Sequence, residues 1–176
     1  MNINEDMEEI LKYAHFFNWA PDWCVVQKIY NNFPESYSVL TPFAYSYLEE
    51  LIRSTTSQYG RELCDINGNP IKRCVGKDLI KLAKKENSNN TEYIKLLNEI
   101  KKYFNNSSIF DNGNNRNSVD HGYMHPRFWE KESFEALIHD IARISKFSGF
   151  YNIFKKLRSS DKMWVNLNTR KCMLKI

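Results

Sequence analysis

Residues 41–55 have the sequence TPFAYSYLEELIRST, in which apolar side chains recur at helical spacing. One face of such a helix carries a continuous stripe made by Ala44, Leu48, Leu51, Ile52 and Thr55. Thr41 followed by Pro42 is typical of a helix start, because a hydroxyl caps free N–H groups and proline fits the first helical position. We therefore predict a long core helix that begins at Thr41 and ends before Gly60.

Two further helices are predicted before this stretch, over residues 4–17 and 23–33. Asn4 is placed to cap the first of them, and Pro21 is expected to end it. The second is rich in aromatic residues and stops at Pro34, because proline lacks the N–H that a helix interior needs.

After the central stretch, lysine-rich helices are predicted over 78–86 and 91–104, with Thr91 as the cap of the second. Turn-forming residues predict loops at 65–70 and 105–115. A last amphipathic helix follows Pro126 and is expected to bend at Gly149.

These elements predict an all-α, up-and-down helical bundle that forms a single domain over residues 1–176. Within it we expect a core over about 41–158, N-terminal helices over 1–40 and an irregular tail over 161–176. Residues 163–176 alternate enough in polarity that a short strand pair is the alternative to a tail.

Charge is distributed unevenly along the chain. Residues 1–60 carry three Lys or Arg against eight Asp or Glu, a net −5, whereas the remainder carries 22 against 13, a net +9. A positive C-terminal half suits a polyanion such as RNA, although lysines on solvated helix faces give the same count. Lys155, Lys156 and Arg158 are the candidate RNA contacts.

Several protein classes are disfavoured by composition. Apolar runs end well before the roughly 20 residues of a membrane span, and the acidic start differs from a secretory signal. Cys24, Cys64, Cys74 and Cys172 lie far apart and form no Cys-x2-Cys pair of the zinc or redox type. We expect reduced core thiols in a cytoplasmic protein that does not contact membranes.

Residues 114–126, with the sequence NNRNSVDHGYMHP, concentrate the side chains suited to chemistry. Gly122 can end a short helix directly after His121, which would place Arg116 near the start of that helix. Cleavage of RNA by its own 2′-hydroxyl needs a base for the hydroxyl proton and a cation for the phosphate, and no metal. Histidine titrates near neutral pH and arginine binds two phosphate oxygens at once.

The motif Arg116-Asn117-x3-His121-Gly122-Tyr123, which lies between a penultimate and a final helix, resembles the Arg-x4-6-His signature of the HEPN family. The resemblance covers residues 91–147 and extends towards Thr41, where the polar residues Glu49, Glu50 and Arg53 match an earlier helix of the family. It implies a helical bundle, commonly a homodimer, that cuts single-stranded RNA in toxin–antitoxin, antiphage or stress systems without a cofactor or metal.

Carried over to this chain, the resemblance makes His121 the acid or base and Arg116 the phosphate ligand. Asn117 would orient the pair, with Asp120, Tyr123 and His125 as supporting residues. Tyr123 is also the candidate site of adenylylation, since family members paired with a nucleotidyltransferase antitoxin are modified two residues after the histidine. An antitoxin or nucleotidyltransferase is therefore an implied partner.

Two alternatives stay open. In the first, Arg116 serves only to bridge helices through Asp120 or Asp111, as in catalytically silent HEPN modules that bind RNA or protein. A metal-dependent phosphohydrolase of the HD type is the other, because His121 and His125 are four residues apart and His139 precedes Asp140. Gly122 and Pro126 count against it, since they interrupt the regular helix that would align the two histidines.

Overall fold

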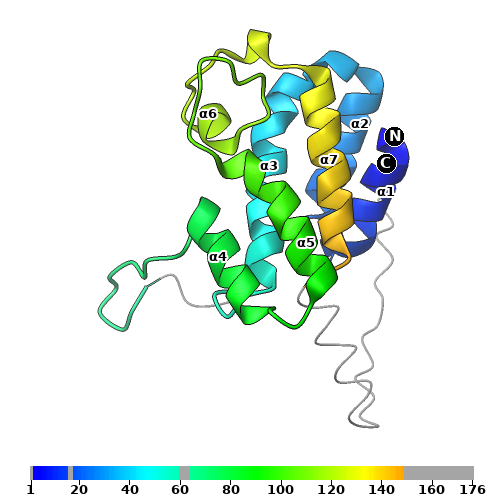
Figure 1. The fold of residues 1–176 in the computed structure, drawn as a ribbon. Coiled ribbons are helices and arrows are strands. Elements are labelled where there is room, and N and C mark those ends of the chain that lie inside the picture. The colour runs from blue at the N-terminus through cyan, green and yellow to red at the C-terminus, as the bar shows by residue number, and fades with distance from the viewer. Residues whose placement is uncertain (1, 16–17, 60–63, 149–176) are drawn as a thin grey trace, which may run out of the picture.

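Two long helices, α3 and α7, lie side by side through the middle of the chain (Figure 1). In this computed structural model the described residues are 2–15, 18–59 and 64–148. The α-helices are α1 (Ile3–Ala14), α2 (Ala20–Asn32), α3 (Tyr37–Ser54), α4 (Gly76–Glu86), α5 (Thr91–Ile100), α6 (Arg116–Asp120) and α7 (Lys131–Ser145). Short 3-10 turns occur as η2 (Pro34–Ser36), η3 (Lys101–Phe104) and η4 (Pro126–Phe128). The predicted all-α helical bundle is confirmed.

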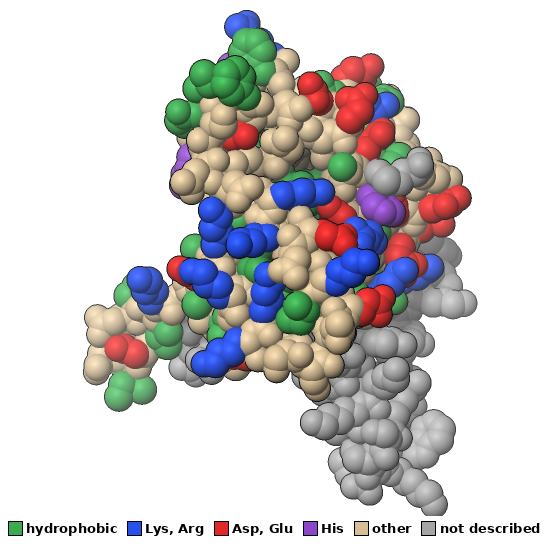
Figure 2. All heavy atoms as spheres, in the orientation of Figure 1, with side chains coloured by type: hydrophobic (Ala, Val, Ile, Leu, Met, Phe, Trp, Pro, Cys, Tyr) green, Lys and Arg blue, Asp and Glu red, His purple; other side chains and the backbone are tan. Residues whose placement is uncertain are grey.

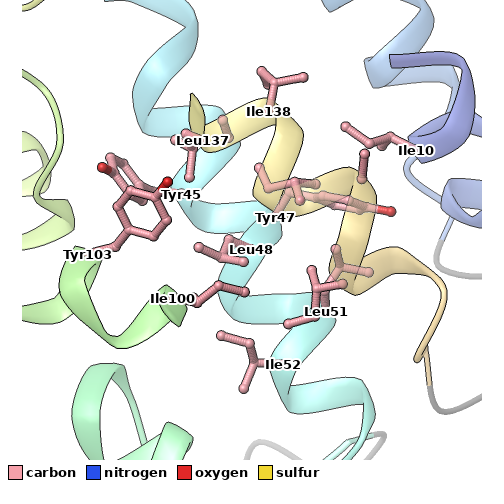
Figure 3. Packing of buried hydrophobic residues seen from close by; sticks show 14 of the residues in the cluster. Ile10, Tyr45, Tyr47, Leu48, Leu51, Ile52, Ile100, Tyr103, Leu137 and Ile138 are labelled. Atoms are coloured by element: carbon pink, nitrogen blue, oxygen red, sulfur yellow. The ribbon is translucent and has the colours of Figure 1, made fainter. Parts of the chain in front are cut away.

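The core forms around α7, which packs against α1, α3 and α5. Figure 3 shows Leu48 of α3 within this cluster, with Leu137 of α7 and Ile100 of α5 among its neighbours. Aromatic rings extend the core towards the N-terminal helices, because Trp23 of α2 packs edge-on against Tyr47 with ring centroids 5.1 Å apart. Burial of such apolar surface is the main stabilising contribution to a bundle of this kind.

The start of the central helix differs from the prediction. Helix α3 begins at Tyr37, and Pro42 lies inside it. Thr41 does not cap the helix; its hydroxyl donates to the carbonyl of Tyr37 at 2.7 Å. Pro42 is the sixth residue of α3, so it removes the hydrogen bond to the carbonyl four residues earlier, and its ring crowds that carbonyl. The helix continues through it because most of the apolar residues of α3 are buried in the core.

Other helix boundaries also differ from the prediction, because the capping residues are not the ones expected. Asn2, not Asn4, caps α1 by accepting the Asn4 N–H at 3.2 Å. Pro21 lies in the first turn of α2 and does not end α1, because its fixed φ is compatible with a helix start. Asn90, not Thr91, caps α5.

The expectation of core cysteines was wrong for two residues. Cys24 and Cys64 are exposed and Cys74 is half-buried, all three as free thiols, while Cys172 lies outside the described residues. The loops at 65–70 and 105–115 are observed, the first closed by a single bridge between Cys64 and Pro70. Residues 149–176, including the predicted bend and tail, are outside the described part. None of the described helices is both long and apolar enough to cross a membrane.

Candidate functional site

The site is built on α6, a helix of five residues that joins the 105–115 loop to the segment before α7. Asn115 caps its start, because the side-chain oxygen accepts the Asn117 N–H at 2.9 Å. Gly122 ends it with a φ of 62°, a left-handed conformation that favours glycine. Arg116 is therefore the first residue of the helix and His121 its C-cap, as predicted.

Asparagine side chains fix the loop that precedes α6. The Asn115 amide donates to the carbonyl of Asn105 at 3.3 Å and of Asn106 at 3.1 Å. The Asn117 amide donates to the same Asn105 carbonyl at 2.9 Å. Asn117 thus contributes more to anchoring this loop than to orienting Arg116, whose Nη1 lies 3.5 Å from its side-chain oxygen.

The core holds the other end of the same loop. The buried Tyr45 hydroxyl of α3 donates to the carbonyl of Gly113 at 2.9 Å. Burial, followed by the negative charges of Asp120 and Asp111, raises the pKa of Tyr45 well above 10, so this donor keeps its proton. Trp129 is buried against Gly113 and leaves space for no side chain there.

Arg116 is held between two carboxylates. Its Nη2 lies 3.2 Å from Oε2 of Glu49 on α3, and its Nε lies 2.8 Å from Oδ2 of Asp120 one helical turn later. The Glu49 side chain is only 9% exposed and also accepts the Gly76 N–H at 2.8 Å. Arg116 itself is 20% exposed, so the guanidinium is partly open to solvent.

Asp120 is electrostatically coupled to both residues of the motif. Burial raises the pKa of its carboxyl above the ordinary 3.8; Arg116 opposes this rise, Glu49 adds to it and His121 opposes it. The side chain of His121 is exposed at the end of α6. The structure therefore arranges a guanidinium, a carboxylate and an imidazole along one short helix.

Tyr123 and His125 follow α6 in the chain, and both are exposed. Tyr123 is 56% exposed, while its backbone N–H donates to the Ser118 carbonyl at 2.9 Å. The exposed His125 caps η4, because its Nδ1 accepts the Arg127 N–H at 3.2 Å. Lys155, Lys156 and Arg158 lie outside the described residues.

The residues proposed as metal ligands are used otherwise. His139 of α7 has its Nδ1 3.1 Å from both carboxylate oxygens of Asp6 on α1. Asp140 accepts the Tyr103 hydroxyl at 2.7 Å and the Arg143 guanidinium at 2.8 Å. Within the described ranges, no three His, Cys, Asp or Glu side chains gather as a metal site would require.

Sequence reasoning named Asp120 and Asp111 as bridging partners of Arg116 and missed Glu49 in that role. Asp111 instead accepts the Ser118 hydroxyl and the Ser108 N–H, which fixes the loop. An acidic residue between the apolar positions of the α3 stripe was the available signal for Glu49. A carboxylate placed that close to a core usually has a buried partner.

Comparisons of the chain with protein-family models, curated proteins and solved structures found no match. The HEPN hypothesis therefore rests on the motif between Arg116 and Tyr123 and on its place in a helical bundle.

Proposed function

We propose that this chain is a metal-independent endoribonuclease that cuts single-stranded RNA at the α6 site. The carrying observation is that Arg116 and His121 bracket α6, with Asp120 electrostatically coupled to both. His121 accepts the 2′-hydroxyl proton, and the 2′-oxygen attacks the adjacent phosphorus. The bond from phosphorus to the 5′-oxygen breaks, and the leaving oxygen takes a proton from water while His121 gives its proton to the hydroxide so formed. The products are a 2′,3′-cyclic phosphate and a 5′-hydroxyl.

Arg116 has one donor group available for phosphate. Its Nη2 is occupied by Glu49 and its Nε faces Asp120, whereas Nη1 has only the long contact with Asn117. The two carboxylates hold the guanidinium in one orientation, and a cation that is held in place stabilises charge on a phosphate better than a mobile one. The proposed role of Arg116 is to bind a non-bridging phosphate oxygen through Nη1.

A homodimer is part of the proposal. Apolar side chains are exposed on the segments flanking α6, namely Ile109, Phe110, Tyr123 and Phe128. Figure 2 shows hydrophobic side chains gathered at the end of the molecule where α6 lies. A second copy covering this end would bring two α6 sites together and bury that surface. Light scattering on the purified chain measures this: a monomer at all concentrations rules out a shared site.

A catalytically silent RNA- or protein-binding module is the second candidate. The observation favouring it is the charge around Arg116, where two carboxylates face one guanidinium. An excess of negative charge weakens phosphate binding, and ion pairs of this kind also serve purely to join helices.

The deciding experiment compares wild type with His121→Ala on a mixed RNA pool in EDTA, with the ends of the products mapped. His121 is exposed, so its loss leaves the fold intact, whereas Arg116→Ala also leaves Glu49 without its partner. Arg116→Lys, which keeps the charge, is the second variant, and His139→Ala is the matched histidine control. Cleavage to 2′,3′-cyclic ends by wild type and His139→Ala alone supports the nuclease. Equal cleavage by His121→Ala contradicts it, and binding without cleavage identifies the silent module.

A further inference from the structure

A surface rich in lysine covers the helices that precede the α6 site. On α4, Lys77, Lys81, Lys84 and Lys85 recur at helical spacing on one side, opposite the buried Leu79, Ile80 and Ala83. On α5 and η3 the same face is continued by Lys95, Lys101 and Lys102. We refer to these seven residues as the lysine face, and Figure 2 shows Lys and Arg side chains gathered over this part of the molecule.

Contacts between the two elements show that the lysine face is one surface. Lys84 of α4 donates to the Asn98 side chain of α5 at 2.5 Å. Burial, together with the positive charge of Lys101, lowers the pKa of Lys84. Lys95 and Lys101 each lie three residues from Asn98, so they share its side of the helix.

Most of this positive charge is not balanced locally. Among the described residues, Lys77, Lys85, Lys95 and Lys101 form no ion pair. Lys81 pairs with Asp78 at 2.9 Å, and Lys102 pairs with Asp140 at 3.3 Å. The acidic excess lies elsewhere, on residues 1–60 with their net −5. A field of one sign over one face attracts a polyanion and is weakened by salt.

The lysine face leads to α6 through an open hollow. The hollow has a volume of about 540 Å³, and its lining includes Lys102 of the lysine face and Asn115, the cap of α6. Asn105, Asn106 and Asn114 also line it, together with the acidic residues Asp111 and Glu132. Such a lining suits the neutral edges of a ribose or base better than a phosphate.

We infer that the lysine face binds the phosphate backbone of single-stranded RNA and that the hollow receives a nucleoside on the way to Arg116 and His121. The inference rests on the proposed RNA substrate, but it concerns binding and does not require the chain to cut. It places the electrostatic contacts on α4, α5 and η3, in addition to any made by the basic C-terminal segment.

The test uses the full chain carrying His121→Ala, so that no cutting disturbs the measurement. Lys81→Gln with Lys85→Gln removes one paired and one unpaired lysine from the lysine face. The matched control, Lys12→Gln with Lys28→Gln, removes one paired lysine of α1 and one unpaired lysine of α2. Binding of a labelled single-stranded RNA of roughly 15 nucleotides is followed by fluorescence anisotropy between about 50 and 200 mM salt.

The lysine-face variant should raise Kd roughly three- to tenfold and reduce the slope of log K against log salt by about 1.4, since each single-strand phosphate contact contributes about 0.7. The control variant should change neither Kd nor the salt slope appreciably. The inference is overturned if the two double variants change Kd equally, if neither changes it, or if the parent chain does not bind the RNA. Tighter binding of duplex DNA than of RNA overturns it as well. The cleavage assay tests the proposed function separately. If wild type produces no 2′,3′-cyclic ends but the lysine-face variant still weakens RNA binding, the proposed nuclease activity is refuted and the inference about binding stands.

Discussion

The carboxylate of Glu49 on α3 lies 3.2 Å from the guanidinium of Arg116 on α6, 67 residues later in the chain. Its other oxygen accepts the N–H of Gly76 at the start of α4 at 2.8 Å. One nearly buried side chain therefore joins three helices and fixes the position of the proposed phosphate ligand. Removal of either partner from such a pair leaves a charge without compensation.

Glu49→Ala should lower the free energy of unfolding by about 2–3 kcal/mol, because it removes the acceptor of the Gly76 N–H and leaves Arg116 with Asp120 as its one carboxylate partner among the described residues. Glu49→Gln keeps an acceptor oxygen and should cost less. The neighbouring Glu50→Ala is the control, since Glu50 pairs with Arg53 at 3.0 Å and is 28% exposed, a setting worth about 1 kcal/mol at most. Urea unfolding measures all three, and equal losses at positions 49 and 50 would contradict this assignment.

Gly113→Ala should destabilise the chain by about 2 kcal/mol or more, through backbone strain together with overpacking. Its φ is 90°, and an added Cβ would lie 3.0 Å from the Cβ of Trp129. Gly68→Ala is the matched control, with a φ of 79° but no atom within 4 Å. The difference between the two unfolding free energies isolates the contact with Trp129; if they are equal, that contact contributes nothing.

Tyr45→Phe should cost about 1–2 kcal/mol, because the buried carbonyl of Gly113 loses its donor. It should also reduce RNA cleavage, since the loop that positions α6 is held less firmly. Tyr123→Phe is the control for stability, because that side chain is exposed. Thermal unfolding followed by circular dichroism compares the two, and a Tyr45→Phe chain as stable as Tyr123→Phe would show that the hydrogen bond is dispensable.

The acid response of the site should depend on Asp120. Burial raises the pKa of this carboxyl, so the folded chain binds its proton more readily than the unfolded chain does. Its contribution to stability is therefore greatest below the unfolded value of 3.8 and is lost as pH rises through the folded value. The stability of wild type relative to Asp120→Asn should be higher at about pH 4 than at about pH 7. A difference that is constant with pH, measured by urea titration, would refute the shift.

The long amphipathic segments could be predicted because their apolar spacing is a property of the local sequence. The stripe from Ala44 to Ile52 is buried as expected, and Gly122 ends α6 where a left-handed residue was needed. Boundaries were less predictable, because proline is compatible with several places near a helix start. Pro21 was expected to end the first helix but lies in the first turn of the second, and Pro42 was expected to begin α3 but lies inside it.

The partners of Arg116 could be predicted only in part. Asp120 is one helical turn away, so spacing alone suggests the contact. Glu49 is distant in sequence, and its contact depends on how α3 and α6 pack, which no local pattern encodes. The asparagine contacts that hold the 105–115 loop are equally non-local in origin, since polar loop residues have many partners to choose from.

Because Arg116 pairs with Glu49 and His121 does not, replacing these two residues should have different effects on the amount of folded protein in a cell. Alleles that replace Arg116 leave the Glu49 carboxylate near the core without its ion-pair partner, so the cell should hold less of the folded chain. Any phenotype of such alleles would then combine lower protein abundance with loss of the proposed RNA cleavage. Alleles that replace the exposed His121 carry no such penalty and should accumulate to normal abundance. A selection that scores only phenotype would treat the two positions as equivalent, whereas immunoblots of the surviving clones would tell them apart.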